Sequence, residues 1–344
     1  MPSNEYDFLI VGQGLAGSLI AFELINRDQR VMVIDNHHVD SSTQVAAGLI
    51  NPITGHRLNI TERFNLYNEA ARKFYHQAEE QLGKQFYREV DQVRRINNAG
   101  QADYCAKRLE QDEYENLLAR TTNSDFLQSE FGCISVKQTA VVDSKLLLNS
   151  YREWLKSKAA YAARKFDYAS LETRGSRFCY GAINAKRVIF CEGYQAIHNP
   201  WLKDLPFKLA KGEILTIETE QHSTKMLSWG NWLVPSRANF AKLGSNFAWN
   251  DLSLSPSDEI KNKLLSSLRD NTNIQGQVKS HEVGIRPTTT QRKPFVGELT
   301  KLANSYCLNG LGSKGCLIAP YYCGLLADHL LKGSRLPTEV TQWL

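Results

Sequence analysis

A glycine-rich turn between two apolar segments at the start of the chain constrains the fold more than any other feature. The run YDFLIV (residues 6–11) is followed by Gly12, Gly14 and Gly17 in the spacing G-x-G-x-x-G, and then by apolar residues at helical spacing. A second apolar run, VMVID, ends at Asp35. A strand, a tight turn, a helix and a second strand in about thirty residues form a βαβ unit, which predicts a parallel sheet.

Each residue of this motif has a physical role in binding a dinucleotide. Gly12 permits the tight turn, Gly14 lets the backbone approach a diphosphate, and Gly17 allows the helix to pack closely on the strand. The helix N-terminus attracts phosphate charge, and the Asp35 carboxylate, eighteen residues after Gly17, can accept hydrogen bonds from ribose hydroxyls. The motif predicts a dinucleotide site but does not distinguish NAD from FAD.

Composition and charge are those of a globular protein. Of the 344 residues, 42% are apolar and 22% are charged, which is enough apolar material for one large domain or two ordinary ones. The net charge of +5 is spread along the chain, so it gives a nucleic-acid partner little electrostatic support.

The first residues and the cysteines favour a cytoplasmic protein with no metal site. The opening MPSNEYD is polar and acidic, unlike a secretory signal peptide. The apolar run 8–25 contains three glycines, Gln13 and Glu23, so we interpret it as strand, turn and helix and not as a membrane span. The seven cysteines show no C-x-x-C spacing and no paired histidines, which favours free thiols in a reducing compartment.

Helical and strand-like segments alternate along the rest of the chain. We expect helices over residues 62–82, 103–121 and 141–158, the last with Asp143 as its N-cap. Residues of about 207–250 are strand-like, with prolines and many turn residues, and are typical of a mostly antiparallel β-structure.

The predicted fold class is therefore α/β, with a Rossmann-like, doubly wound parallel sheet and an inserted, mostly antiparallel-β substrate domain. We assign residues 1–80, 135–200 and 285–344 to the dinucleotide-binding domain. Residues 81–134 and 201–284 are assigned to the substrate domain.

A second glycine-rich loop lies near the C-terminus. Residues 309–320 read NGLGSKGCLIAP, with Gly310, Gly312 and Gly315 before an apolar run that predicts a helix from about 315 to 332. Upstream, residues 284–297 read GIRPTTTQRKPFVG. Together these two motifs resemble the C-terminal pattern of the FAD-dependent D-amino acid oxidase and glycine oxidase family, which includes sarcosine oxidase-like members.

Further segments match the same family in the same order, so the resemblance covers essentially the whole chain. They are AAGLINP (residues 46–52), VVDSKLLL before a helix, RVIFCEGYQA, KGEILTI and WLVPSRANFAKLGS. In the family, the segment that corresponds to AAGLINP places small residues beside the flavin.

The resemblance implies that FAD extends from the first glycine loop to the second. Its diphosphate would lie at residues 12–17, and its ring would lie at residues 312–315 and the N-terminus of the last helix. Helix N–H groups would stabilise the negative charge of a reduced flavin by roughly 0.3–2 kcal/mol. No cysteine occurs within residues 284–297, where some relatives tether the flavin, so we expect non-covalent FAD. The expected FAD-binding residues are Gly12, Gly14, Leu15, Ala16, Gly17, Asp35, Ala46, Ala47, Gly48, Leu49, Phe166, Cys191, Gly193, Arg286, Gly312, Ser313, Lys314 and Gly315.

The resemblance also implies an amine or amino-acid oxidoreductase, either an oxidase or a dehydrogenase. Such an enzyme oxidises the C–N bond of an amino acid or secondary amine by hydride transfer to flavin N5, and the cofactor carries the chemistry.

Three residues are the catalytic candidates, each with a plainer alternative. Arg286, in GIRP, corresponds to an arginine that grips the substrate carboxylate; the alternative is a structural arginine held by backbone carbonyls. Lys242 corresponds to a lysine that lies over the flavin and assists the reaction with oxygen, or it is a surface lysine at a strand end. Lys314 faces flavin O2 or an anionic substrate, or it extends into solvent.

Five aromatic residues either wall an amine pocket or belong to the core: Trp229, Trp232, Trp249, Tyr321 and Tyr322.

Two other functions stay open at this point. The loop GLGSKG is similar to the loop in the oxidase half of the bifunctional enzyme that completes 5-methylaminomethyl-2-thiouridine in tRNA, where the substrate is a modified uridine. The other alternative is an FAD-binding protein without turnover. Ser313 stands where glycine oxidases carry an arginine, which argues against a plain glycine-type substrate. The sequence leaves open the amine, the electron acceptor and the oligomeric state.

Overall fold

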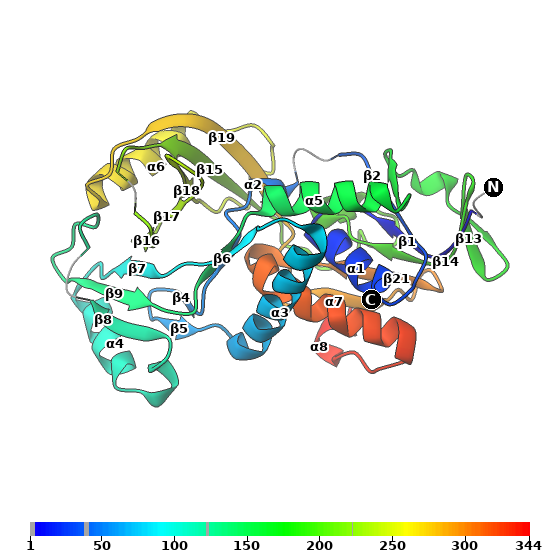
Figure 1. Ribbon diagram of the computed structural model, residues 1–344, viewed down its shortest axis with the longest axis horizontal. Helices are drawn as coiled ribbons and strands as arrows, with labels where there is room; N and C mark the ends of the chain where they lie inside the picture. Colours follow the sequence, from blue (N-terminus) through cyan, green and yellow to red (C-terminus); the bar gives the residue numbers. More distant parts are fainter. Residues whose placement is uncertain (1–3, 38–40, 122–123, 222) are drawn as a thin grey trace.

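Two sheets and their helices form the two ends of an elongated molecule (Figure 1). The computed structural model describes residues 4–37, 41–121, 124–221 and 223–344. Near the N-terminus a mixed sheet is covered by long helices, and at the opposite end lies a mostly antiparallel sheet. This confirms the predicted α/β fold class with a second, antiparallel β-region.

The first sheet has the parallel centre that the glycine motif predicts. Its parallel strands follow the order β11-β2-β1-β14-β21, and the strands β13 and β20 pair antiparallel with β14 and β21. The strands are β1 (Glu5–Val11), β2 (Val31–Asp35), β11 (Tyr161–Ala163), β12 (Glu172–Arg174), β13 (Arg177–Tyr180), β14 (Ile183–Phe190), β20 (Phe295–Glu298) and β21 (Ser305–Asn309).

Four helices pack together on this sheet and share its main hydrophobic core: α1 (Leu15–Ile25), α3 (Phe64–Leu82), α5 (Ser144–Ser157) and α7 (Gly315–Lys332). The last three confirm the helices expected over 62–82, 141–158 and 315–332. Helix α1 is apolar on nearly every side because it lies between the sheet, α5 and α7. Asp143 is the N-cap of α5, as predicted, since its carboxylate accepts a 3.0 Å hydrogen bond from the Leu146 N–H.

The second sheet follows the order β19-β15-β18-β17-β16-β7-β9-β8, with neighbours antiparallel except for the parallel pair β16 and β7. Helix α6 (Asp258–Asn271) packs on β15 and closes the core of this region. The strands are β7 (Gln92–Arg95), β8 (Leu118–Thr121), β9 (Cys133–Val136), β15 (Ala210–Glu218), β16 (Met226–Ser228), β17 (Trp232–Pro235), β18 (Phe240–Gly244) and β19 (Gln277–Arg286). The residue ranges assigned to the two domains remain a prediction.

The remaining elements are short strands, helices and turns outside these two sheets. They are α2 (Ser42–Val45), β3 (Leu49–Ile50), β4 (Ile53–Thr54), β5 (Asn59–Ile60), β6 (Tyr87–Glu89), α4 (Ala99–Leu109), β10 (Ala140–Val142), α8 (Thr338–Thr341) and the 3₁₀ turns η1 (Asp112–Tyr114), η2 (Tyr168–Ser170), η3 (Gly193–His198) and η4 (Gly312–Lys314). All seven cysteines are buried and free of disulfides. None of the helices in the described ranges has both the length and the apolar character needed to span a membrane.

The helix expected over residues 103–121 is wrong in its second half. Helix α4 ends at Leu109, and Leu118–Thr121 form β8, which pairs with β9. The periodicity of apolar residues did extend past Leu109, but pairing with a distant strand satisfies the backbone of these residues and overrides their local helical preference.

Candidate active site

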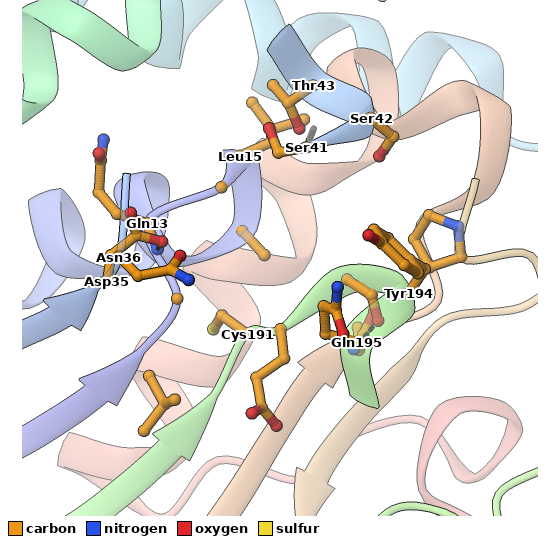
Figure 2. Close-up of a pocket in the computed structure, with 18 of the residues that line it drawn as sticks. Gln13, Leu15, Asp35, Asn36, Ser41, Ser42, Thr43, Cys191, Tyr194 and Gln195 are labelled. Carbon is orange, nitrogen blue, oxygen red and sulfur yellow. Dashed lines mark hydrogen bonds between the residues drawn. The ribbon is translucent and has the colours of Figure 1, made fainter. Parts of the chain in front are cut away.

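A cavity of about 490 Å³ lies at the carboxyl ends of β1, β2 and β14 (Figure 2). Its walls include the first glycine loop, Asp35 and Cys191. In a parallel α/β sheet this edge is where ligands bind, because the loops that follow neighbouring strands separate there. We call this space the first cavity.

The glycines of the loop differ in what surrounds them. A Cβ on Gly17 would lie 1.8 Å from the Gly12 carbonyl oxygen, so Gly17 is required for packing of α1 on the loop. A Cβ on Gly14 would meet no atom within 4 Å, so this position stays open toward the first cavity, whose wall it forms. Gly12 has a φ of +97°, which an L side chain rarely adopts.

The N-terminus of α1 presents hydrogen-bond donors to the first cavity. Its N-cap residue, Gly14, has no side chain to cap the helix, and no acidic residue lies in the first turn. The first N–H groups of a helix have no intrahelical acceptor, so those of the first turn are free to bind an anion. Leu15 and Ala16 of this turn line the cavity.

Asp35 is held at the end of β2 by the backbone. Its Oδ2 accepts a 2.9 Å hydrogen bond from the Gln13 N–H, and its Oδ1 accepts a 2.8 Å bond from the His37 N–H. The side chain is buried and lines the first cavity. It therefore offers further acceptor sites to a ligand with hydroxyl groups.

A second cavity, of about 290 Å³, adjoins the first. The two share wall residues from both glycine loops and from α2, namely Leu15, Ser42, Thr43, Gly312 and Gly315. Helix α7 begins at this junction, and it has neither a capping side chain nor an acidic residue in its first turn. The two glycine loops therefore line adjoining cavities, with an uncapped helix N-terminus at each.

The wall of the second cavity combines small, apolar and cationic residues. Ala46, Ala47, Gly48 and Leu49 form one side, and a Cβ on Gly48 would lie 1.8 Å from the Val142 carbonyl oxygen. Larger apolar residues, namely Ile214, Trp232, Phe247 and Leu317, form much of the rest. Among the described wall residues the charged ones are Arg286 and Lys314, so the cavity suits an anionic group.

Arg286 lies at the end of β19 with its guanidinium buried against the cavity wall. The guanidinium donates to Ser245 Oγ at 2.8 Å and to the carbonyl oxygens of Lys211 and Asn246 at 3.3 Å each. Burial lowers the pKa of Arg286 to about 10. In the described part of the chain no carboxylate lies within ion-pair distance of it. The structure is therefore compatible with both interpretations of Arg286. Backbone carbonyl groups hold the guanidinium, as in a structural arginine, and it also faces the cavity, where it could bind a carboxylate.

The two candidate lysines lie at different depths. Lys314 Nζ donates to Thr61 Oγ1 at 3.0 Å, and the residue lines the second cavity. Lys242 Nζ lies behind the wall and donates to the carbonyl oxygens of Ala46 at 2.8 Å and Val45 at 3.2 Å. Burial lowers the pKa of both lysines.

Most residues predicted to bind FAD lie on these walls. Those on the first cavity are Gly12, Gly14, Leu15, Ala16, Asp35, Phe166, Cys191, Gly193, Gly312 and Gly315. Those on the second are Leu15, Ala46, Ala47, Gly48, Leu49, Arg286, Gly312, Ser313, Lys314 and Gly315. Gly17 and Lys242 are absent from both sets, since Gly17 packs against the loop and Lys242 lies behind Ala46. Whether these residues contact FAD stays a prediction.

Several wall residues were missed by the sequence reasoning. The polar segment Ser41–Thr43 leads into AAGLINP, so its position beside a predicted flavin segment is a signal that could have found it. Arg152, on α5, and Glu192, after β14, also line the first cavity. Glu192 lies within the segment RVIFCEGYQA, between the predicted residues Cys191 and Gly193, so this motif could have found it. No motif marks Arg152, because only the packing of α5 brings it to the site.

The aromatic candidates have different environments. Trp232 lines the second cavity, whereas Trp229 is buried and its Nε1 donates to Ser267 Oγ. Tyr322 is a core residue whose hydroxyl bonds to that of Tyr67. Trp249 is 54% exposed and belongs to neither group.

Comparison with known proteins identifies the family of this chain. The sequence model of the family described as DAO, FAD dependent oxidoreductase, matches residues 7–329. Similar solved structures include glycine oxidase from Bacillus cereus, at 17% identity and a TM-score of 0.79, with 96% of each chain covered. Iminodiacetate oxidase from a Chelativorans species is 18% identical with a TM-score of 0.79, covering 97% of this chain and 98% of that one.

L-proline dehydrogenase from P. horikoshii is 15% identical, has a TM-score of 0.77, and covers 98% of this chain and 96% of its own. At these identities the structures establish a shared fold. The family match extends over nearly the whole sequence, from the strand before the first glycine loop to the helix after the second. The chain therefore belongs to the DAO family of FAD-dependent oxidoreductases.

Proposed function

We propose that this enzyme holds FAD non-covalently along the two joined cavities and oxidises the C–N bond of an amino acid or a secondary amine that carries a carboxylate. The partly buried guanidinium of Arg286 faces the second cavity and has no carboxylate partner among the described residues, and this observation carries the proposal.

The described residues fit FAD at both ends of the site. The uncapped N-terminus of α1 and the open position at Gly14 suit a diphosphate, and the buried acceptors of Asp35 suit ribose hydroxyls. The N-terminus of α7, with Gly312 and Gly315, suits the electron-rich edge of a flavin ring. The small residues from Ala46 to Leu49 leave room for a flat ring in the second cavity.

FAD, when bound, supplies the two-electron acceptor, so that the amine loses a hydride from carbon and a proton from nitrogen and becomes an imine, which water hydrolyses. The chain's own residues bind and orient the amine. Arg286 offers a planar set of donors to a carboxylate, and Trp232 and Phe247 give the second cavity an apolar wall.

The wall of the second cavity has no histidine and no carboxylate among its described residues. No imidazole or carboxylate in the described part of this wall is therefore placed to remove a proton from the substrate. We infer that the amine reacts in its neutral form, so that kcat/KM rises with pH until the amine is deprotonated.

Non-covalent attachment is supported by the state of the cysteines near the cavities. Cys191 and Cys316 line the walls, and burial raises the pKa of Cys316 to about 12 and that of Cys191 well above its usual range. A thiol that stays protonated is a poor nucleophile. Precipitation with trichloroacetic acid should release all of the yellow colour into the supernatant, and colour retained in the pellet would contradict this part of the proposal.

The function is tested by the flavin absorption band of the purified enzyme under argon. Amines are added in matched pairs that differ only in a carboxylate, such as sarcosine with dimethylamine and phenylalanine with phenethylamine. We expect the carboxylated member of at least one pair to bleach the band faster than its partner. Equal rates within every pair, or no bleaching by any amine, would overturn the proposal.

A further inference from the structure

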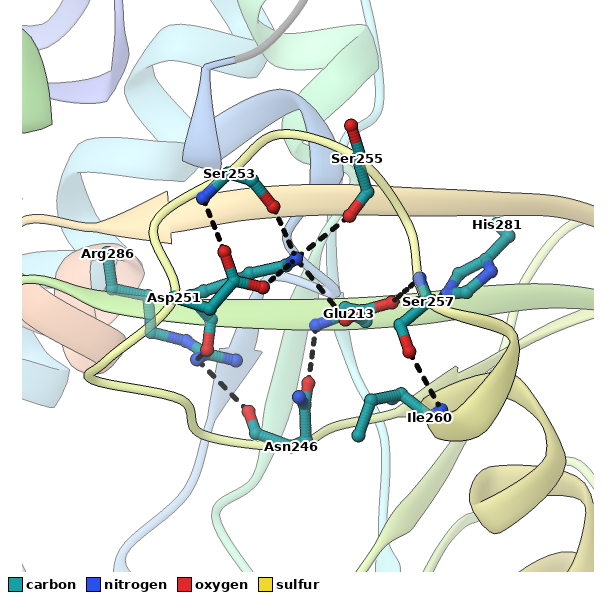
Figure 3. Close-up of polar contacts among 10 residues, drawn as sticks. Glu213, Asn246, Asp251, Ser253, Ser255, Ser257, Ile260, His281 and Arg286 are labelled. Carbon is teal, nitrogen blue, oxygen red and sulfur yellow. Dashed lines mark hydrogen bonds and ion pairs between the residues drawn. The ribbon is translucent and has the colours of Figure 1, made fainter.

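The segment from Ser245 to Ser257 connects β18 to α6. Figure 3 shows its residues Asn246, Asp251, Ser253, Ser255 and Ser257 around β15. Its first residues belong to the second cavity, because Ser245 and Phe247 line the wall. The remaining residues turn away and cross the opposite face of β15. We call residues 245–257 the substrate loop.

A buried lysine of β15 holds this loop. Lys211 is 1% exposed, and its ammonium donates to Asp251 Oδ2 and to the Ser255 carbonyl oxygen, each at 2.8 Å, and to Ser253 Oγ at 3.1 Å. Its backbone also exchanges two hydrogen bonds with Ala248. All three hydrogen bonds of the ammonium are with the loop, so one cation fixes its middle.

Glu213, two residues further along β15, fixes both ends of the loop. Its Oε2 accepts a 2.8 Å hydrogen bond from the Ser257 N–H, and its own N–H donates to Asn246 Oδ1 at 2.7 Å (Figure 3). The Glu213 carboxylate also lies 3.7 Å from the Lys211 ammonium. Lys211 and Glu213 thus form one buried charged pair that faces the loop.

The residue between them faces Arg286. Successive residues of a strand point to opposite faces, so Gly212 lies on the cavity side of β15, and a Cβ there would come within 2.2–2.4 Å of the Arg286 guanidinium. The acceptors of that guanidinium are the Lys211 carbonyl oxygen and two groups of the loop, on Ser245 and Asn246. The position of the loop therefore determines the direction in which Arg286 points.

Apolar burial does not hold the loop in place. Its large apolar side chains are exposed, at 48% for Phe247, 54% for Trp249, 39% for Leu252 and 37% for Leu254. A fully buried ammonium is costly to desolvate and is retained where its hydrogen bonds specify one arrangement. The hydrogen bonds of Lys211 therefore hold this loop in place of buried apolar side chains.

We propose that Lys211 is a positioning residue for substrate recognition: by holding the substrate loop against β15, it keeps the Ser245 and Asn246 acceptors and the Phe247 ring around Arg286. The proposal rests on the proposed function, in which Arg286 binds the substrate carboxylate. Lys211 itself lies on the opposite face of the strand from the substrate.

The test compares three variants of the FAD-loaded enzyme. Lys211→Met removes the ammonium at similar volume, and Asp251→Asn weakens the contact from the loop side without altering the sheet. Lys279→Met is the matched control, because it removes another β-strand lysine of the same sheet, whose 2.6 Å ion pair with Glu218 lies away from the loop. Hydrogen–deuterium exchange of residues 245–257 reports the loop directly, without substrate or turnover.

We expect faster exchange of residues 245–257 in Lys211→Met, a smaller increase in Asp251→Asn, and no change in Lys279→Met. Carboxylate binding is then measured with benzoate from the shift of the flavin band, and benzamide serves as a neutral probe of similar shape. The dissociation constant for benzoate should rise about tenfold or more in Lys211→Met, and that for benzamide by less than about twofold.

The possible outcomes distinguish a failure of the Lys211 proposal from a failure of the proposed role of Arg286. Unchanged exchange in a folded Lys211→Met variant and in Asp251→Asn would overturn the proposal. A loosened loop with unchanged benzoate affinity, or with equal losses for the two probes, would also overturn it. A wild-type enzyme that binds benzamide as well as benzoate would instead contradict the role of Arg286, and with it the proposed function.

Discussion

The guanidinium carbon of Arg286 lies 4.2 Å from the centre of the Phe247 ring, on the wall of the second cavity. The ring faces the cation, and the hydrogen-bond acceptors around it are neutral oxygens. A cation–π contact stabilises the guanidinium but does not neutralise its charge. The positive charge of Arg286 therefore stays unneutralised by these contacts, and an anionic ligand would neutralise it.

Replacing Arg286 with lysine should weaken the binding of carboxylated amines. Lysine keeps the charge but loses the planar set of donors, so we expect a rise in KM equivalent to about 1–3 kcal/mol. Decarboxylated analogues should be nearly unaffected in the same steady-state assay. If both classes of substrate lose equally, Arg286 does not bind the carboxylate.

Gly14 and Gly17 should respond differently to alanine. Gly17→Ala places a methyl group 1.8 Å from a backbone oxygen, so we expect a loss of ~3 kcal/mol in the free energy of unfolding. Gly14→Ala meets no atom within 4 Å, so stability without FAD should change by less than about 1 kcal/mol, while the dissociation constant of FAD should rise at least tenfold or so. Urea denaturation and FAD titration separate the two effects. A Gly14→Ala variant that binds FAD normally would show that the diphosphate lies elsewhere.

Lys242→Met should slow the reaction of the reduced enzyme with oxygen. The ammonium lies directly behind Ala46 of the cavity wall, where a positive charge favours the formation of superoxide. We expect reoxidation to be ~10–100-fold slower, with a much smaller effect on reduction by the amine under argon, as measured by stopped-flow absorbance. Equal reoxidation rates for variant and wild type would indicate that Lys242 serves only to hold the Val45 and Ala46 carbonyls.

Glu192 should make stability depend on pH. Burial raises its pKa from 4.5 to about 7, although Tyr168 and Asn199 donate hydrogen bonds to it. An acid with a raised pKa in the folded state costs nothing below about pH 4.5, and the cost grows as the pH rises to about 7. Glu192→Gln should therefore raise the free energy of unfolding by ~1–3 kcal/mol at pH 8 and leave it unchanged at pH 4.5. A difference that is constant with pH would rule out titration of Glu192 as its cause.

The first glycine loop and Asp35, which line the first cavity, could be predicted because their structural requirements are local. Gly12, Gly14 and Gly17 act through the backbone of one turn, and Asp35 follows at a fixed spacing in the same βαβ unit. The substrate end could be predicted only in part. Arg286 was found from its motif, but its acceptors on Lys211 and Asn246 come from separate strands and loops. No spacing in the sequence relates residues that only the second sheet brings together.

The helix expected over residues 103–121 shows the same limit. Its apolar periodicity extends past Leu109, but Leu118–Thr121 form a strand that pairs with Cys133–Val136 in the second sheet. The environment of the Lys211 side chain could not be predicted from the sequence either. In the sequence it is one of many lysines, and only the crossing of the substrate loop over β15 buries it and supplies its acceptors.

By itself, then, the sequence determined the α/β class, the two glycine loops and the family, because backbone conformation and helix termini depend on neighbouring residues. The tertiary structure decided which charged groups face the two cavities and which are buried behind their walls. Whether a charged group faces a cavity depends on the packing of segments that are distant in the sequence. This packing sets the burial and the hydrogen-bond partners of the group, and so whether it is available to a ligand.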